Sequence, residues 1–89
     1  MSTLTSTELR AIDQAHLLHP FTDHVPMHAA GTHIITRAEG CHVFDIEGRR
    51  LLDGLAGLWC VNVGYNRPEI AAAIQKQLGT LCYYPSFFN

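Results

Sequence analysis

The sequence is short of charge. Of its 89 residues 16% are charged, against about 25% in an ordinary soluble domain. Six lysine and arginine residues stand against eight aspartate and glutamate residues, and the formal net charge is −2. A chain without a basic excess has no electrostatic attraction for nucleic acid or for an anionic membrane surface. We therefore expect neither as a partner, and we expect other protein to cover much of this weakly charged surface.

Long apolar runs, a leader segment and a regular cysteine pattern are also missing. No stretch approaches the roughly 18–20 apolar residues of a membrane helix. Residues 1–9 contain neither the basic region nor the apolar run of a signal peptide. Three cysteines at irregular spacing are typical of a reducing compartment rather than of a secreted disulfide framework. The sequence therefore predicts a cytoplasmic location.

Familiar catalytic motifs are scarce. There is no Ser-His-Asp arrangement and no P-loop, and Gly54-x-x-Gly57 lacks the spacing of a dinucleotide-binding turn. Lys76 is the only lysine, and it lies two positions after Ile74, off the apolar stripe of its predicted helix. A Schiff-base lysine needs a desolvated position. We therefore expect Lys76 to face solvent and assign no catalytic residue.

Six histidines raise the possibility of a metal site. The spacings His16-x-x-His19 and His24-x-x-x-His28 suit two ligands on one helical face. No cysteine lies near either pair, however, and the neighbouring prolines are expected to interrupt the helices. Solvated loop histidines are the preferred interpretation, and we expect no metal.

Local patterns predict an α+β segment. A capping box of Thr5 and Glu8 begins a helix over residues 5–18, which ends before Pro20. Residues 19–31 contain two prolines and no clear period, and are predicted to be a loop. Residues 32–53 contain three short strands separated by turn signals, which indicates an antiparallel three-stranded meander.

The second half is predicted to hold a loop, a helix and an aromatic ending. Residues 54–65 form the loop. A helix over residues 67–78 follows, with Asn66 as its N-cap, Pro68 and Glu69 in its first turn and Gly79 at its C-terminal cap. Residues 79–89 are an irregular aromatic segment.

The loop over residues 54–65 is the most distinctive part of the chain. It contains three glycines, the only tryptophan and almost no charge, and it is longer than a simple turn needs. Such a loop lets backbone and a large ring approach a ligand closely. Asp53, just before it, is expected to cap it by accepting backbone N–H bonds. From the residues alone, Trp59 fits either a core position or a ligand site.

Four runs together closely resemble the N-terminal part of class III pyridoxal-phosphate aminotransferases, and most of all the ω-amino acid:pyruvate and amine:pyruvate transaminases. They are residues 40–48 (GCHVFDIEG), 52–54 (LDG), 56–65 (AGLWCVNVGY) and 68–70 (PEI). Residues 16–22 and 84–88 look like the same group. The resemblance therefore extends over about residues 9–89.

The resemblance implies a fold, a reaction and a site. This part of the family belongs to the minor domain of a fold-type I enzyme, a homodimer or higher oligomer that uses pyridoxal 5′-phosphate. The enzyme moves an amino group from an amine or ω-amino acid to a keto acid such as pyruvate. Leu58 and Trp59 would line the substrate pocket, with Phe21 and Phe87 as further aromatic walls.

The family's catalytic lysine, pyridinium partner and phosphate-binding turn match no position in residues 1–89. This chain alone, an N-terminal segment of such an enzyme, is therefore expected to be inactive and not to fold stably. The alternative interpretation is a small α+β interaction module without enzymatic activity.

Overall fold

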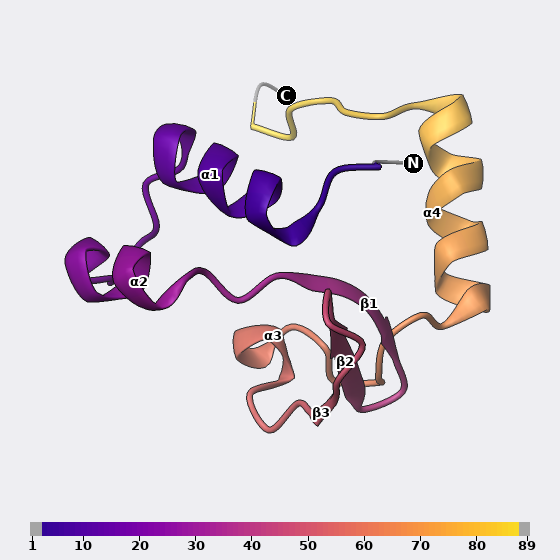
Figure 1. The fold of residues 1–89 in the computed structure, drawn as a ribbon. Helices are drawn as coiled ribbons and strands as arrows, with labels where there is room; N and C mark the ends of the chain where they lie inside the picture. Colours follow the sequence, from indigo (N-terminus) through magenta and orange to yellow (C-terminus); the bar gives the residue numbers. More distant parts are fainter. Residues whose placement is uncertain (1–2, 88–89) are drawn as a thin grey trace.

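The computed structural model describes residues 3–87. Along the chain, two helices precede a small sheet, and one helical turn and a final helix follow it (Figure 1). The elements are α1 (Ser6–His16), α2 (His24–Ala30), β1 (Ile35–Glu39), β2 (His42–Asp45), β3 (Arg50–Leu52), α3 (Ala56–Trp59) and α4 (Pro68–Thr80).

The first helix begins at the expected capping box. The amide of Glu8 donates to Oγ1 of Thr5 at 3.2 Å, and the amide of Thr5 donates to Oε2 of Glu8 at 2.7 Å. These two bonds satisfy N–H groups that have no partner within the helix. The helix ends at His16, two residues before the predicted boundary, and Leu17 already has an extended backbone.

The predicted loop over residues 19–31 is wrong in its second half, where α2 forms. Asp23 caps this helix, and its side chain accepts a bond from the amide of Val25 at 3.3 Å. Pro26 lies in the first turn, where a backbone N–H has no intrahelical partner to lose. The proline is therefore compatible with the helix that it was expected to interrupt.

The antiparallel meander is confirmed. The sheet has the order β1-β2-β3, with Val43 paired to Ala38 on one side and to Leu51 on the other. A register shift lies between Ile35 and Arg37. β2 ends at Asp45, just before the turn to β3, and Asp45 is 3% exposed.

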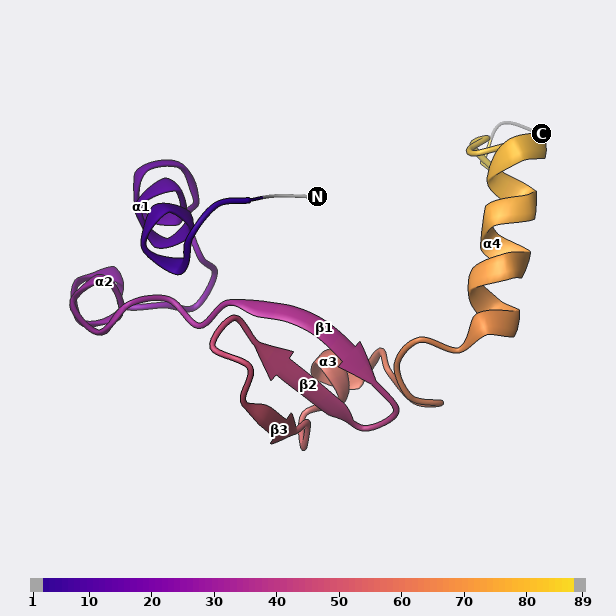
Figure 2. The same ribbon diagram turned by 45° about the vertical axis from the view of Figure 1, so that its right-hand side comes forward.

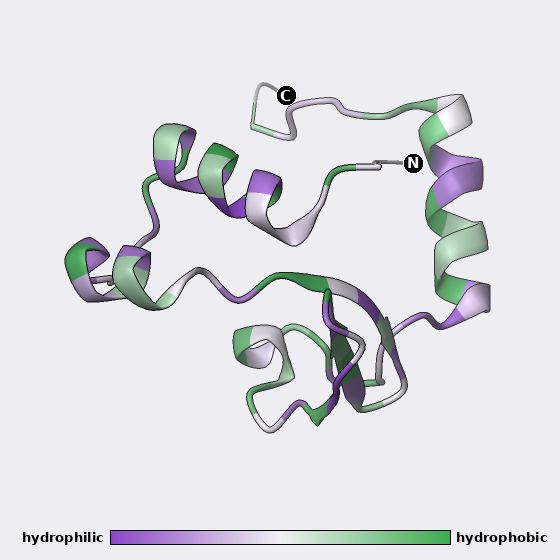
Figure 3. Ribbon diagram, viewed as in Figure 1, coloured by the Kyte–Doolittle hydropathy of each residue, from purple (hydrophilic) through white to green (hydrophobic). Residues whose placement is uncertain are grey.

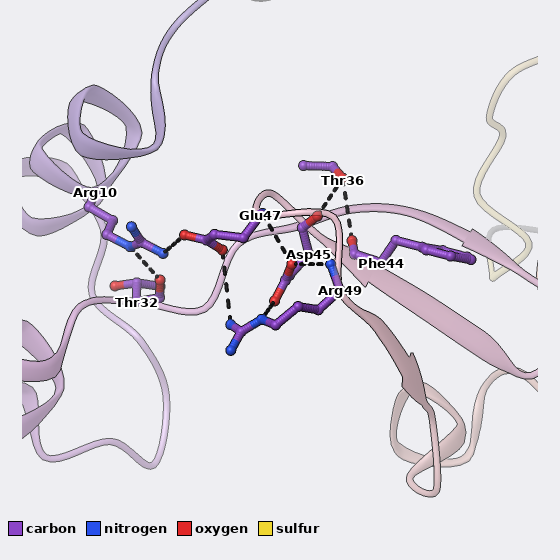
Figure 4. Close-up of polar contacts among 7 residues, drawn as sticks. All are labelled: Arg10, Thr32, Thr36, Phe44, Asp45, Glu47 and Arg49. Carbon is purple, nitrogen blue, oxygen red and sulfur yellow. Dashed lines mark hydrogen bonds and ion pairs between the residues drawn. The ribbon is translucent and has the colours of Figure 1, made fainter.

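An arginine connects the first helix to the sheet. Nη2 of Arg10 lies 2.9 Å from Oε1 of Glu47, and its Nε donates to the carbonyl of Thr32 at 3.0 Å. Figure 4 shows this contact beside the Asp45 turn. The β2–β3 turn therefore carries polar contacts to a segment more than 30 residues away in sequence.

The last helix runs over Pro68–Thr80, and both predicted caps are wrong. Asn66 has φ 55 and donates its Nδ2 to the carbonyl of Ala38, while Arg67 is the N-cap. Gly79 lies inside the helix rather than at its cap, since only Leu81 turns extended. Pro68 is at the first turn as expected.

The apolar side chains of the described residues are not buried. No hydrophobic residue within residues 3–87 is buried. The Cα radius of gyration is 16.9 Å, against about 12 Å for a compact chain of this length. Figure 2 shows α4 standing apart from the sheet and from α1, and Figure 3 shows apolar stretches along it. These surfaces require covering that this segment does not supply by itself.

Across the residues that the structure describes, no helix has both the length and the apolar character that a membrane crossing requires. The predicted aromatic segment is irregular from Leu81 onward, and its residues 88 and 89 lie outside the described part of the chain.

Candidate functional site

Asp53 fastens the glycine-rich loop at both of its ends. Its Oδ1 accepts N–H bonds from Leu55 at 3.0 Å and from Ala56 at 3.2 Å, as the sequence predicts. Its Oδ2 accepts a bond from the hydroxyl of Tyr65, at the far end of the loop. The Tyr65 bond and then the Leu55 amide lower the pKa of Asp53, while the Asp53 carboxylate raises the pKa of Tyr65. The carboxylate therefore stays ionised and keeps its acceptor role near neutral pH.

The turn α3, inside the predicted loop, is not an ordinary helix. Ala56, Gly57, Leu58 and Trp59 have φ values of 54, 60, 61 and 73. For residues with a Cβ atom this left-handed region costs roughly 1–2 kcal/mol each. Such backbone persists only where the surroundings fix it, and it occurs most often at functional sites.

Two glycines allow the loop to close tightly. A Cβ on Gly57 would lie 2.9 Å from Cγ2 of Val61, and one on Gly64 would lie 3.2 Å from the carbonyl oxygen of Gly40. The neighbouring amide of Tyr65 donates to that same carbonyl at 2.7 Å. Close backbone approach of this kind requires glycine. The base of the loop is thus bonded to the turn between β1 and β2.

The loop presents Leu58 and Trp59 outward. Leu58 is 64% exposed and Trp59 is 85% exposed. A core role for Trp59 within the described residues is therefore excluded. An aromatic ring held outward on a fixed backbone is suited to contact a ligand or another surface.

The other two predicted wall residues come from distant segments. Phe21 precedes α2, has φ 50 and is fully exposed, and Phe87 lies in the final segment and is also exposed. A hollow of about 210 Å³ lies beside the loop, lined in part by Asp53, Val61 and Tyr65. None of the four predicted wall residues lines it. The described residues therefore do not gather these four side chains around this hollow.

The single lysine is not placed for covalent chemistry. Lys76 lies on α4, whose residues are all exposed. That helix stands apart from α3 in both views (Figures 1 and 2). An exposed ammonium lacks the desolvation that lowers a lysine pKa for Schiff-base formation.

The histidines form structural contacts. Nε2 of His19 lies 2.8 Å from Oδ1 of Asp13, and the backbone N–H of His19 donates to Nε2 of His24 at 2.9 Å. The expectation of solvated loop histidines is wrong for these two, because α2 brings His24 back toward the end of α1. No group of three or more His, Cys, Asp or Glu among residues 3–87 is arranged to hold a metal ion.

The sequence pattern of the family described as aminotransferase class-III matches residues 25–89, which include the sheet, the fastened loop and α4. The chain belongs to the class-III aminotransferases. A related aminotransferase of this family, the putrescine–pyruvate aminotransferase of Pseudomonas aeruginosa, is 47% identical over 82 residues, which is 92% of this chain and 18% of the relative. A chloroplastic gamma aminobutyrate transaminase of Solanum lycopersicum is 39% identical over 97% of this chain and 16% of the relative.

Solved aminotransferase structures share the fold of this segment. An (S)-enantioselective ω-transaminase from Thermomicrobium roseum superposes with a TM-score of 0.90 at 43% identity, covering 99% of this chain and 20% of that one. A Bacillus anthracis aminotransferase gives 0.83 at 45% identity, covering 100% of this chain and 19% of that one. The chain spans about a fifth of the length of the relatives it matches.

One residue that shapes the loop has a contact that the sequence does not predict. Tyr65 closes the loop onto Asp53 and onto the β1–β2 turn. No spacing rule connects a tyrosine with an aspartate twelve positions earlier, so the sequence does not reveal the Tyr65–Asp53 hydrogen bond. Its place directly after Gly64, at the end of a loop opened by a capping aspartate, is the only available signal.

Proposed function

We propose that this chain is the N-terminal segment, residues 1–89, of a transaminase that moves an amino group from an ω-amino acid or amine to a keto acid such as pyruvate. Membership of the class-III aminotransferases supports the reaction class. The names of relatives, putrescine–pyruvate and taurine–pyruvate aminotransferase, support amine donors and pyruvate. The observation that carries the proposal is the left-handed turn that holds Leu58 and Trp59 outward.

In this proposal the segment supplies walls to the amine site. Leu58 and Trp59 form one apolar wall, and Phe21 and Phe87 contribute further aromatic surface from other segments or from a second subunit. All four side chains are exposed here. A wall of this kind sorts amines by size and apolar character.

The described residues do not fit pyridoxal 5′-phosphate by themselves. Lys76 is exposed, and the hollow beside the loop is lined by Asp53, a carboxylate that would repel a phosphate. We therefore assign the cofactor to parts of the proposed enzyme outside residues 1–89. There it would supply the electron sink of the reaction. Within this segment the residues bind and orient the amine side chain and exclude water from it.

A cytoplasmic homodimer or larger homo-oligomer completes the proposal. Ile70, Ile74 and Leu78 form an exposed apolar stripe on α4, as expected of a helix that meets other protein.

The cysteines support the cytoplasmic location. Cys41, Cys60 and Cys82 are free and exposed, which suits a reducing compartment.

The test is an assay of the protein encoded by the complete gene. The purified protein, supplied with pyridoxal phosphate, is mixed with pyruvate and with β-alanine, putrescine or benzylamine, and alanine is measured. We expect amine-dependent formation of alanine with at least one donor. Absence of alanine with every donor, from protein that is folded and carries the cofactor, would overturn the proposal.

A further inference from the structure

We propose that Asp53 and Tyr65 are positioning residues that set amine selectivity by fixing the loop that carries Leu58 and Trp59. The inference rests on the proposed function, because it concerns the wall that the loop presents. Neither residue is proposed to touch the substrate. They act through the backbone between them.

The two carboxylate oxygens of Asp53 bind opposite ends of the loop. Oδ1 of Asp53 holds the amides of Leu55 and Ala56, where the loop begins. Oδ2 holds the hydroxyl of Tyr65, where the loop ends. Hydrogen bonds to an ionised acceptor are shorter and stronger than bonds between neutral groups. A single side chain therefore sets the distance between the two ends.

Hydrogen bonds connect Asp53, through Ala56, to the two residues that follow Trp59. The carbonyl of Ala56 accepts the amides of Cys60 at 3.0 Å and Val61 at 2.9 Å. Ala56 is thus bonded to Asp53 through its N–H and to the two residues after Trp59 through its carbonyl. A shift of the carboxylate would move the turn that presents the ring.

The Leu58 and Trp59 side chains themselves do little to hold the turn within the described residues. Trp59 is 85% exposed and Leu58 is 64% exposed. Their backbone φ values are unfavourable for residues with a Cβ atom. Something outside these side chains must maintain the turn. Asp53 is bonded to the start of the turn through the Leu55 and Ala56 amides, and Tyr65 joins the same carboxylate to the end of the loop.

The test compares Tyr65→Phe and Asp53→Asn in the complete holoenzyme. The readout is the ratio of kcat/KM for benzylamine to kcat/KM for β-alanine. This ratio does not depend on the fraction of active protein, so a general loss of folded enzyme leaves it unchanged. Tyr65→Phe removes one hydroxyl only, which keeps the test available if Asp53→Asn does not fold.

Glu8→Gln is the matched control. Like Asp53, Glu8 is a carboxylate that accepts bonds from a backbone N–H and a hydroxyl, both from Thr5. It lies at the start of α1, in a different element from the loop. This variant tests whether the loss of any such carboxylate alters selectivity.

We expect both clamp variants to lower the ratio by roughly threefold to tenfold, mainly through a higher KM for benzylamine, because a looser wall contacts the ring less well. Glu8→Gln should keep the wild-type ratio. An unchanged ratio in both clamp variants, with wild-type enzyme active, overturns the clamp and leaves the proposed function standing. Wild-type enzyme without transaminase activity overturns the proposed function instead.

Discussion

Arg49 closes the β2–β3 turn onto Asp45. Its Nε lies 2.6 Å from Oδ2 of Asp45, and its backbone N–H donates to Oδ1 at 2.8 Å (Figure 4). The amide of Glu47 adds a third bond at 3.1 Å. Asp45 is the one buried residue among those the structure describes, so its carboxylate is shielded from solvent although the Arg49 side chain is 64% exposed.

The turn should therefore open in acid. Burial by itself raises the pKa of Asp45, but the bonds from Arg49 and Glu47 and the charge of Arg49 outweigh it, so the pKa lies below its ordinary value of 3.8. A carboxyl group whose pKa is lower in the folded than in the unfolded state stabilises the fold at pH values above its unfolded pKa. This stability is lost as the pH falls through its folded pKa. We expect the amides of Glu47 and Arg49 to lose protection from hydrogen exchange only below pH 3.8. Loss of protection between pH 5 and 7 would contradict this prediction.

Three glycine substitutions separate backbone strain from steric clash. Gly57→Ala meets both a φ of +60 and a Cβ contact of 2.9 Å with Val61. Gly48→Ala meets a φ of +86 with open space, and Gly54→Ala meets neither. Strain alone costs roughly 1–2 kcal/mol, so the local free energy of opening should fall by that amount for Gly48→Ala and further for Gly57→Ala.

Hydrogen exchange measures these local free energies in the complete protein. The Gly48 amide, bonded to the carbonyl of Asp45, reports on the turn that contains Gly48. The Cys60 and Val61 amides report on the loop that contains Gly57. Gly54→Ala serves as the unchanged control. Equal effects of all three substitutions would show that the left-handed loop backbone is not present in solution.

The isolated 89-residue chain should not fold cooperatively. No apolar side chain among residues 3–87 is buried, and stability in small domains comes mainly from such burial. We expect a weak near-UV dichroism of Trp59 and a broad, non-cooperative thermal transition. A sharp transition with strong near-UV bands would contradict this expectation and would favour the independent interaction module.

Lys76 should be dispensable for the proposed reaction. It is an exposed residue of α4, and α4 stands apart from α3 (Figure 2). Lys76→Ala in the complete enzyme should leave kcat within about twofold, since surface substitutions rarely change a protein much. A loss of several orders of magnitude would identify Lys76 as the catalytic lysine and would refute its exposed placement.

Sequence reasoning succeeded where a short local pattern decides the structure. The Thr5–Glu8 capping box and the Asp53 cap both involve partners within three residues, and both are present. The meander followed from strand and turn signals of the same local kind. These features require no knowledge of distant residues.

Sequence patterns do not predict a conformation that depends on the position of a residue within a turn or on partners distant in sequence. The sequence predicts that Pro26 interrupts a helix, whereas a proline in the first turn of α2 loses no hydrogen bond. Asn66 matched a cap pattern, yet its side chain bonds to Ala38, 28 residues away. The Tyr65 bond to Asp53 and the left-handed run through Trp59 depend on loop closure, which no periodicity reports.

The most direct test of the account is the amine selectivity of Trp59→Ala in the complete holoenzyme, with Leu18→Ala as the control. Leu18 is also an exposed apolar residue, at 83%, but lies outside the loop. If Trp59 is a wall of the amine site, the ratio of kcat/KM for benzylamine to that for β-alanine should fall about tenfold, and Leu18→Ala should leave it unchanged. A Trp59→Ala ratio equal to that of the wild type would contradict the account.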